Sequence, residues 1–120
     1  MATYRMYTDA EGRACWEAVD LAKTPEWLEG LDSSKIRFGV REPGVLQDWH
    51  PAPQRQFVII LSGSLEIGFE DGSRKVFGAG DARLVEDTTG KGHTTRVVGK
   101  EDRVSIAIPL ADQTVGRAGR

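Results

Sequence analysis

This sequence has almost no cysteine, no long apolar run and no large excess of either charge. Cys15 is its single cysteine, so no internal disulfide can form and nothing demands an oxidising compartment. Residues 1–5 do not begin the apolar segment of a signal peptide, and no apolar run reaches membrane-spanning length. The 16 basic and 18 acidic residues give a net charge of -2, which offers no electrostatic surface for nucleic acid or anionic membranes. We therefore expect a cytoplasmic protein that binds neither nucleic acid nor membranes.

What the chain does have is the composition and periodicity of a small β-rich domain. Its 120 residues suit one domain, expected over 1–120, and 39% hydrophobic with 28% charged residues is ordinary for a globular protein. Several segments alternate apolar and polar residues, as half-buried strands do, and glycine-containing turns separate them. Seven or eight such short strands predict an all-β sandwich or barrel. The alternating segments are Ile36-Phe38-Val40, Leu65-Ile67-Phe69 and Val104-Ile106-Ile108, and residues 56–61 are apolar on both faces.

The N-terminal part adds a different local pattern. Thr24, Pro25 and Gly30 match the N-cap, first position and end of a single helical turn. Residues 4–19 are expected to form one or two outer strands. The small and polar tail, residues 111–120, is expected to fray.

Histidine is also scarce, and the two histidines, His50 and His93, each stand in a pattern. Gln56 follows His50 by six positions, and Gly63 follows Gln56 by seven. Gly80 begins a second segment, which runs through a strand and a turn to His93. This spacing resembles the two motifs of cupins: H-x-H, three or four spacers, Glu, six spacers and Gly, and later a Gly-led segment that closes on His. The chain is therefore similar to a small single-domain cupin.

The resemblance implies an all-β fold, the double-stranded β-helix or jelly-roll barrel of cupins. It implies a barrel core over 36–109, an N-terminal arm over 1–35, a homodimer, and a ligand inside the barrel. In cupins the H-x-H pair, the Glu and the last His hold a metal ion. Here Ala52 replaces the second His and Gln56 replaces the Glu, and the usual Pro-x-Gly turn before the last His is absent. The motif spacing is kept, while the usual ligand set is incomplete.

Alternation along strands extends the set of inward-facing residues. If His50 points inward, Asp48 does so too unless a bulge intervenes, and an inward Glu86 would bring Leu84 with it. We expect an apolar cup whose polar groups are His50, Gln56 and His93, with the carboxylates of Asp48 and Glu86 at its edge as substrate-binding groups. The apolar cup is expected to comprise Val58, Ile60, Leu84 and Ile106, whereas Asp87 and Lys91 are expected in a surface turn.

Metal binding is a separate question from the position of the histidines. A divalent cation takes three or four donors, usually with anionic character, and the motif positions supply two imidazoles and one neutral amide. A metal-free or weakly metallated pocket is the favoured prediction. The alternative is zinc, iron, nickel or manganese held by His50, His93 and Gln56, with Asp48 as a carboxylate that could complete the set.

Two classes of function are compatible with these residues. The first is an enzyme of isomerase, lyase or oxygenase type that acts on a small polar metabolite, with His50 and His93 as acid and base and Gln56 as a hydrogen-bond donor. The second is a non-catalytic module that binds a small molecule in the barrel. The sequence names neither substrate nor reaction.

Overall fold

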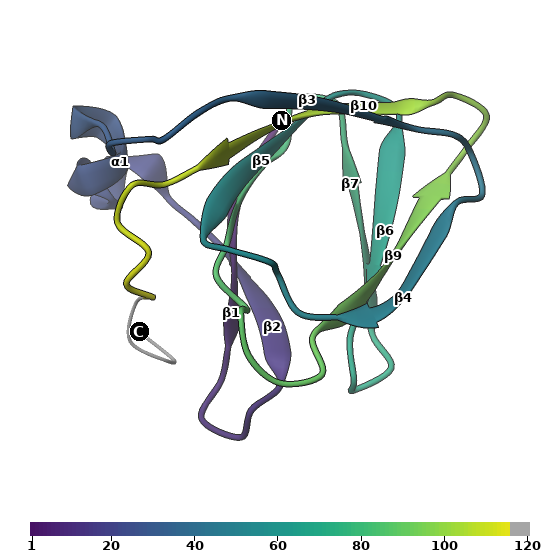
Figure 1. The fold of residues 1–120 in the computed structure, drawn as a ribbon, viewed down its shortest axis with the longest axis horizontal. Coiled ribbons are helices and arrows are strands. Elements are labelled where there is room, and N and C mark those ends of the chain that lie inside the picture. Colours follow the sequence, from purple (N-terminus) through teal and green to yellow (C-terminus); the bar gives the residue numbers. More distant parts are fainter. Residues whose placement is uncertain (116–120) are drawn as a thin grey trace.

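The computed structural model describes residues 1–115, which form ten strands and two short helical elements (Figure 1). No helix among these residues is long and apolar enough to cross a membrane. The end of the predicted fraying tail, residues 116–120, lies outside the described part of the chain. The strands are β1 (Thr3–Thr8), β2 (Ala14–Ala18), β3 (Arg37–Arg41), β4 (Leu46–His50), β5 (Gln56–Ser62), β6 (Ser64–Gly68), β7 (Arg74–Gly78), β8 (Ala82–Val85), β9 (His93–Val98) and β10 (Arg103–Pro109); the helical elements are η1 (Leu21–Lys23) and α1 (Pro25–Glu29).

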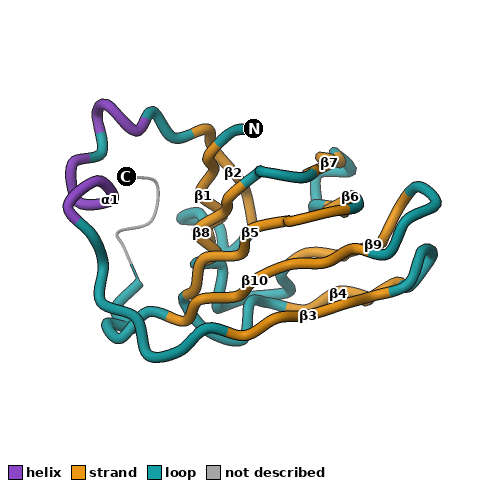
Figure 2. The backbone as a smooth tube through the Cα atoms, turned by 90° about the horizontal axis from the view of Figure 1, so that it is seen from above, coloured by secondary structure: helices purple, strands orange, loops and turns teal. Residues whose placement is uncertain are grey.

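The strands form two sheets that enclose the interior of the protein. The larger sheet has the order β2-β1-β8-β5-β10-β3, and the smaller one has the order β4-β9-β6-β7. Figure 1 and Figure 2 show α1 at one end of the molecule, away from the smaller sheet. The all-β class that the alternating segments predicted is confirmed.

The N-terminal arm is an integral part of the larger sheet. β1 pairs with β8 in parallel and with β2 in antiparallel fashion, so the predicted outer strands extend the sheet at one edge. The predicted helical turn is α1, which Thr24 precedes as N-cap and Gly30 ends with a φ of 114°. The ring of Trp27 in α1 packs edge-on against Phe57 of β5, at 4.8 Å between centroids, and so covers the outer face of the larger sheet at β5.

The apolar core fills only one end of the space between the sheets. Met6, Ile60, Leu65, Ile67 and Phe77 are nearly or completely buried there, and they come from β1, β5, β6 and β7. Each side chain of this kind contributes roughly 1.5–3 kcal/mol through its burial. The other end, towards β3, β4, β9 and β10, is not filled by these side chains and contains the cavity described below.

Two strands present a different face to the interior from the one predicted. Leu84 of β8 pairs with Phe57 on the outer face, beneath the arm that carries α1, so Arg83 and Val85 face inward instead. Ile106 of β10 likewise alternates with inward-facing neighbours. The prediction that Leu84 and Ile106 line the interior was therefore wrong, because the outer face of this sheet is also apolar, covered at β5 and exposed at β3.

Strand β3 also turns polar side chains to the interior. Its apolar residues Phe38 and Val40 are 72% and 62% exposed, as is Ile36 just before the strand at 61%, although Phe38 and Val40 also border the cavity. The alternate residues Arg37 and Arg41 line the interior. The pattern therefore marked a strand correctly, but its polar side faces the inside of the protein.

Candidate functional site

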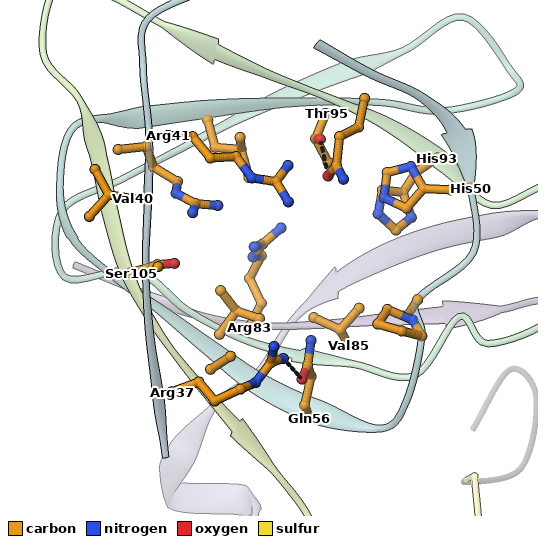
Figure 3. A pocket seen from close by; sticks show the side chains of 18 of the residues that line it. Arg37, Val40, Arg41, His50, Gln56, Arg83, Val85, His93, Thr95 and Ser105 are labelled. Carbon is orange, nitrogen blue, oxygen red and sulfur yellow. Dashed lines mark hydrogen bonds between the residues drawn. The ribbon is translucent and has the colours of Figure 1, made fainter. Parts of the chain in front are cut away.

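The interior contains a cavity of about 460 Å³ between the two sheets. Side chains from β3, β5, β8 and β10 of the larger sheet form one wall, and side chains from β4 and β9 of the smaller sheet form the other (Figure 3). Its volume lies within the usual range for small-molecule sites.

The structure brings His50 and His93 together on the wall formed by the smaller sheet. His50 ends β4, His93 begins β9, and the two residues are direct partners in the antiparallel register. Their ring centroids are 4.7 Å apart, with the ring planes tilted by 57° (Figure 3). His93 is buried and His50 is half-buried, so one ring is enclosed while the other remains accessible.

The hydrogen bonds of both rings assign the same tautomer to each. Nδ1 of His50 lies 2.7 Å from the backbone oxygen of Asp48, and a carbonyl can only accept, so Nδ1 donates. Nδ1 of His93 donates to Oδ2 of Asp87, whose side chain is completely buried. Within residues 1–115 neither Nε2 has a hydrogen-bond partner, which leaves both Nε2 atoms for chemistry. Asp87 fixes the tautomer and orientation of His93, as the buried carboxylate of a Ser-His-Asp triad does.

The loop before His93 is held tightly against the end of β4. Gly92 has a φ of 81°, and a Cβ at this position would lie only 2.0 Å from the backbone oxygen of His50. The backbone N–H of Ala52 donates to the backbone oxygen of Asp87 at 2.9 Å, which joins the same two segments again. This close approach sets the position of both imidazoles and of the carboxylate behind them.

Gln56, the third predicted polar group, lines the cavity but does not join the imidazoles. Its Oε1 accepts from Nε2 of Gln54 at 3.3 Å and from Nη2 of Arg37 at 3.5 Å. Figure 3 shows Gln56 beside Arg37, away from His50 and His93. The structure thus brings two of the three predicted groups together and places the third in another part of the cavity.

The two predicted carboxylates do not line the cavity. The strand register shifts between Gln47 and His50, and this bulge turns the side chain of Asp48 to the exposed outer surface. Glu86 is completely buried on the other side of β8, where Oε1 accepts from Nε of Arg5 and Oε2 from Nε of Arg55, each at 2.8 Å. Glu86 therefore has a structural role, because its carboxylate forms ion pairs with Arg5 and Arg55.

These positions do not fit a tightly bound divalent metal. Among the described residues no group of three or more His, Cys, Asp or Glu could hold a metal ion. His50 and His93 supply two donors, while the oxygen of Gln56 is engaged by Gln54 and Arg37. The arginines that share the cavity would also repel a cation. The donor set and its charge therefore disagree with the metal site that the cupin motifs imply.

Sequence reasoning missed the residues that give the cavity its charge. The guanidinium groups of Arg37, Arg41, Arg83 and Arg103 line it, from β3, β8 and β10. The signal was the alternation of Arg37 and Arg41 with apolar residues in β3, which was interpreted with the opposite face inward. Asp87 was expected in a surface turn, and that expectation was wrong, because its side chain is buried behind His93.

The comparisons with known proteins concern the fold. No family model matches the sequence, and no curated protein does either. The structure of the polyketide cyclase RemF from Streptomyces resistomycificus matches 95% of this chain and 75% of its own, at 16% identity and a TM-score of 0.54. A double-stranded β-helix protein from Klebsiella pneumoniae matches 71% of this chain and 72% of its own, at 21% identity and a TM-score of 0.47.

A cupin-2 domain containing protein from Shewanella frigidimarina matches 77% of this chain and 93% of its own, at 18% identity and a TM-score of 0.44. At such identities the likeness concerns the architecture and not the residues of the site. The chain shares its fold with RemF, and its two β-sheets are the all-β architecture that the resemblance of the motif spacing implied.

Proposed function

We propose that the cavity binds a small polar metabolite and that His50 and His93 transfer protons on it, in an isomerisation or a dehydration. The observation that carries this proposal is the facing pair of imidazoles, each with Nδ1 engaged and Nε2 unengaged within residues 1–115. Near neutral pH an imidazole accepts a proton and an imidazolium donates one, so one ring can act as base while the other acts as acid. RemF, which is similar in fold, is a polyketide cyclase, so this architecture accommodates an enzyme.

The surroundings of the two rings support different roles for them. His93 is enclosed and oriented by Asp87, which suits a base that takes a proton from a bound ligand through Nε2. His50 is half-buried, so its ring can exchange protons with water and return one to the ligand. An isomerisation leaves the number of protons on the ligand unchanged, and a dehydration releases water with the proton that the acid supplies.

The test uses deuterium incorporation, because this readout does not require the natural reaction to be known in advance. Compounds that raise the thermal midpoint would be incubated with the protein in D2O and followed by NMR. We expect His93→Asn to slow incorporation about a hundredfold or more, since general acid–base catalysis contributes at least that much. Asparagine keeps a donor where Nδ1 stood, so the contact with Asp87 and the thermal midpoint should be retained.

Asp48→Asn is the matched control, because its side chain lies on the outer surface and asparagine keeps the acceptor for the N–H of Trp49. It should incorporate deuterium as the wild type does. Ligands that bind the wild type without any incorporation would contradict the enzyme proposal. That result would favour the non-catalytic binding module instead.

We also propose that two copies of the chain pair through the outer face of β3. β3 is the last strand of the larger sheet, so its free edge offers unpaired backbone groups to another strand. Large apolar side chains are exposed on this strand and just before it, namely Phe38, Val40 and Ile36, and exposed apolar patches mark interaction surfaces. A second copy presents the same edge and the same stripe, which makes a two-fold symmetric contact self-complementary.

Phe38→Glu is expected to convert a dimer to a monomer without lowering the thermal midpoint of the fold, because Phe38 is 72% exposed. Sedimentation velocity across a range of concentrations measures this. Leu28→Glu is the control, since Leu28 is similarly exposed, at 64%, but lies in α1. A wild type that sediments as a monomer at every concentration would disprove the pairing.

A further inference from the structure

The cavity is strongly cationic although the whole chain carries a net charge of -2. Four arginines line it, and no Asp or Glu is among the described residues of its walls. We propose that the cavity binds a small organic anion, whose carboxylate or phosphate group is held by Arg83, Arg103 and Arg41. This inference names the ligand class of the proposed function and rests on that function for the use of the cavity.

The side chain of Arg83 contacts the apolar core and points into the cavity (Figure 3). Its residue is only 5% exposed, its guanidinium carbon lies 5.1 Å from the ring centre of Phe77, and its Nη1 lies 3.9 Å from the sulfur of Met6. These contacts hold the side chain without neutralising it. Burial is the main cause that lowers the pKa of Arg83 to about 10, which still leaves the group charged at neutral pH.

Arg41 and Arg103 are a pair of neighbouring positive charges at the cavity. They are direct partners in the antiparallel register of β3 and β10, and both line the cavity. Like charges opposite one another destabilise a sheet. Burial and then Arg41 lower the pKa of Arg103 below its ordinary value. The guanidinium of Arg103 lies close to Gly39, where a Cβ would be in ordinary van der Waals contact with its Nη2 at 3.4 Å.

Counter-charges compensate these groups only in part: within the described residues Asp87 and Asp81 act on Arg83 through space, and each raises its pKa against the effect of burial. Arg41, Arg83 and Arg103 make no ion pair there, and the buried Nε atoms of Arg83 and Arg103 have no hydrogen-bond partner. Neither carboxylate forms an ion pair with Arg83. Oδ2 of Asp87 accepts from His93, while its buried Oδ1 has no hydrogen-bond partner within residues 1–115, and Asp81 accepts from backbone N–H groups. Buried charges without partners are unfavourable, so a bound oxyanion would remove a penalty that the protein alone carries.

The shape of the cavity indicates more than a bare inorganic ion. A volume of about 460 Å³ leaves space beyond a carboxylate or phosphate group, and that space extends to the imidazoles of His50 and His93. Guanidinium groups bind both kinds of oxyanion through paired N–H donors. The ligand is therefore an organic acid or a phosphorylated metabolite, with its anionic end at the arginines and its reacting carbon at the histidines.

The experiment measures binding by calorimetry with succinate, glycerol 3-phosphate and inorganic phosphate as probes, and with uncharged succinamide as the matched neutral compound. We expect at least one organic anion to bind, and succinamide not to bind. The carboxylate and phosphate arms then decide which oxyanion the site prefers. Arg83→Met and Arg103→Met should each weaken binding about 10- to 100-fold, because a hydrogen bond to a charged group is lost in each variant.

Arg96→Met is the control, because Arg96 is exposed on β9 and the variant makes the same change in net charge. It should bind as the wild type does. Thermal midpoints give a second readout: Arg103→Met should raise the midpoint of the ligand-free protein, since it removes the repulsion with Arg41. Phosphate should raise the midpoint more in the wild type than in Arg103→Met at equal ionic strength, which separates binding from general exclusion of phosphate from protein surfaces.

Two results together would overturn the inference: no probe binds more tightly than succinamide, and Arg103→Met lowers the midpoint of the ligand-free protein. The arginines would then serve the fold. This failure differs from that of the proposed function. Anion binding without deuterium incorporation would reject proton transfer and leave the ligand class standing, whereas incorporation into a neutral ligand would reject the ligand class alone.

Discussion

Glu86→Gln is expected to lower the free energy of unfolding by about 3–5 kcal/mol, as breaking a buried ion pair does. The Glu86 side chain is completely buried, and its two oxygens each accept at 2.8 Å from Nε of Arg5 and of Arg55. Glutamine keeps the volume and removes the charge, so two largely buried arginines lose the carboxylate they share. Urea denaturation measures the change as a shift of the midpoint at constant slope.

Glu17→Gln is the matched control for this variant. Glu17 pairs with the same Arg5 at 3.0 Å, but 40% of its side chain is exposed. Exposed pairs contribute at most about 1 kcal/mol, so its variant should unfold close to the wild type. Equal effects of the two substitutions would contradict the role of burial. If a fully folded Glu86→Gln variant lost deuterium incorporation, Glu86 would instead have a role in the proton transfer.

Gly92→Ala is expected to be the second severe change, because the backbone at this position tolerates no Cβ. The φ of 81° costs a non-glycine residue about 1–2 kcal/mol, and displacing packed groups typically costs about 1–3 kcal/mol more. The new methyl group would meet the backbone oxygen of His50 at 2.0 Å and the nitrogen of Pro51 at 2.4 Å. A lower thermal midpoint should be accompanied by a change in the His50 and His93 side-chain NMR signals.

Gly99→Ala separates strain from the clash. Gly99 has nearly the same φ, 83°, but nothing lies within 4 Å of the position its Cβ would occupy. We expect it to cost only the conformational part, about 1–2 kcal/mol, and to leave the histidine signals unchanged. If Gly92→Ala behaves like Gly99→Ala, the segment before His93 is not packed against the end of β4.

Much of the architecture could be predicted because it depends on local patterns. Alternating apolar residues, as in Leu65-Ile67-Phe69, together with glycine turns indicated the all-β class. Leu65 and Ile67 lie in β6, and Phe69 comes directly after its last residue. Pro25 begins α1 and Gly30 ends it, since both residues act through their local backbone conformation, whereas the side chain of Thr24 makes no cap hydrogen bond. The motif spacing around His50 and His93 implied a barrel of two β-sheets, and the strand order and the likeness in fold to RemF agree with it.

The candidate site was only partly predictable. His50 and His93 could be selected because the chain has no other histidines, and the structure places them side by side. Asp48 follows a regular alternation on paper, but the register shift before His50 turns it outward. Asp87 reaches His93 only because the loop between them closes back on β4, a contact that no local pattern encodes.

The sequence by itself thus determined the strands, the turns and the two histidines, since each depends on residues close together in the chain. Only the tertiary structure decided which face of each strand is the inside. Alternation defines two faces of a strand but does not say which one another layer covers. Packing of Trp27 on Phe57 covers the outer face of the larger sheet at β5, and the pairing of β3 with β10 sets Arg41 opposite Arg103. The cationic character of the cavity results from those long-range contacts, because they bring together charges that lie far apart in the sequence.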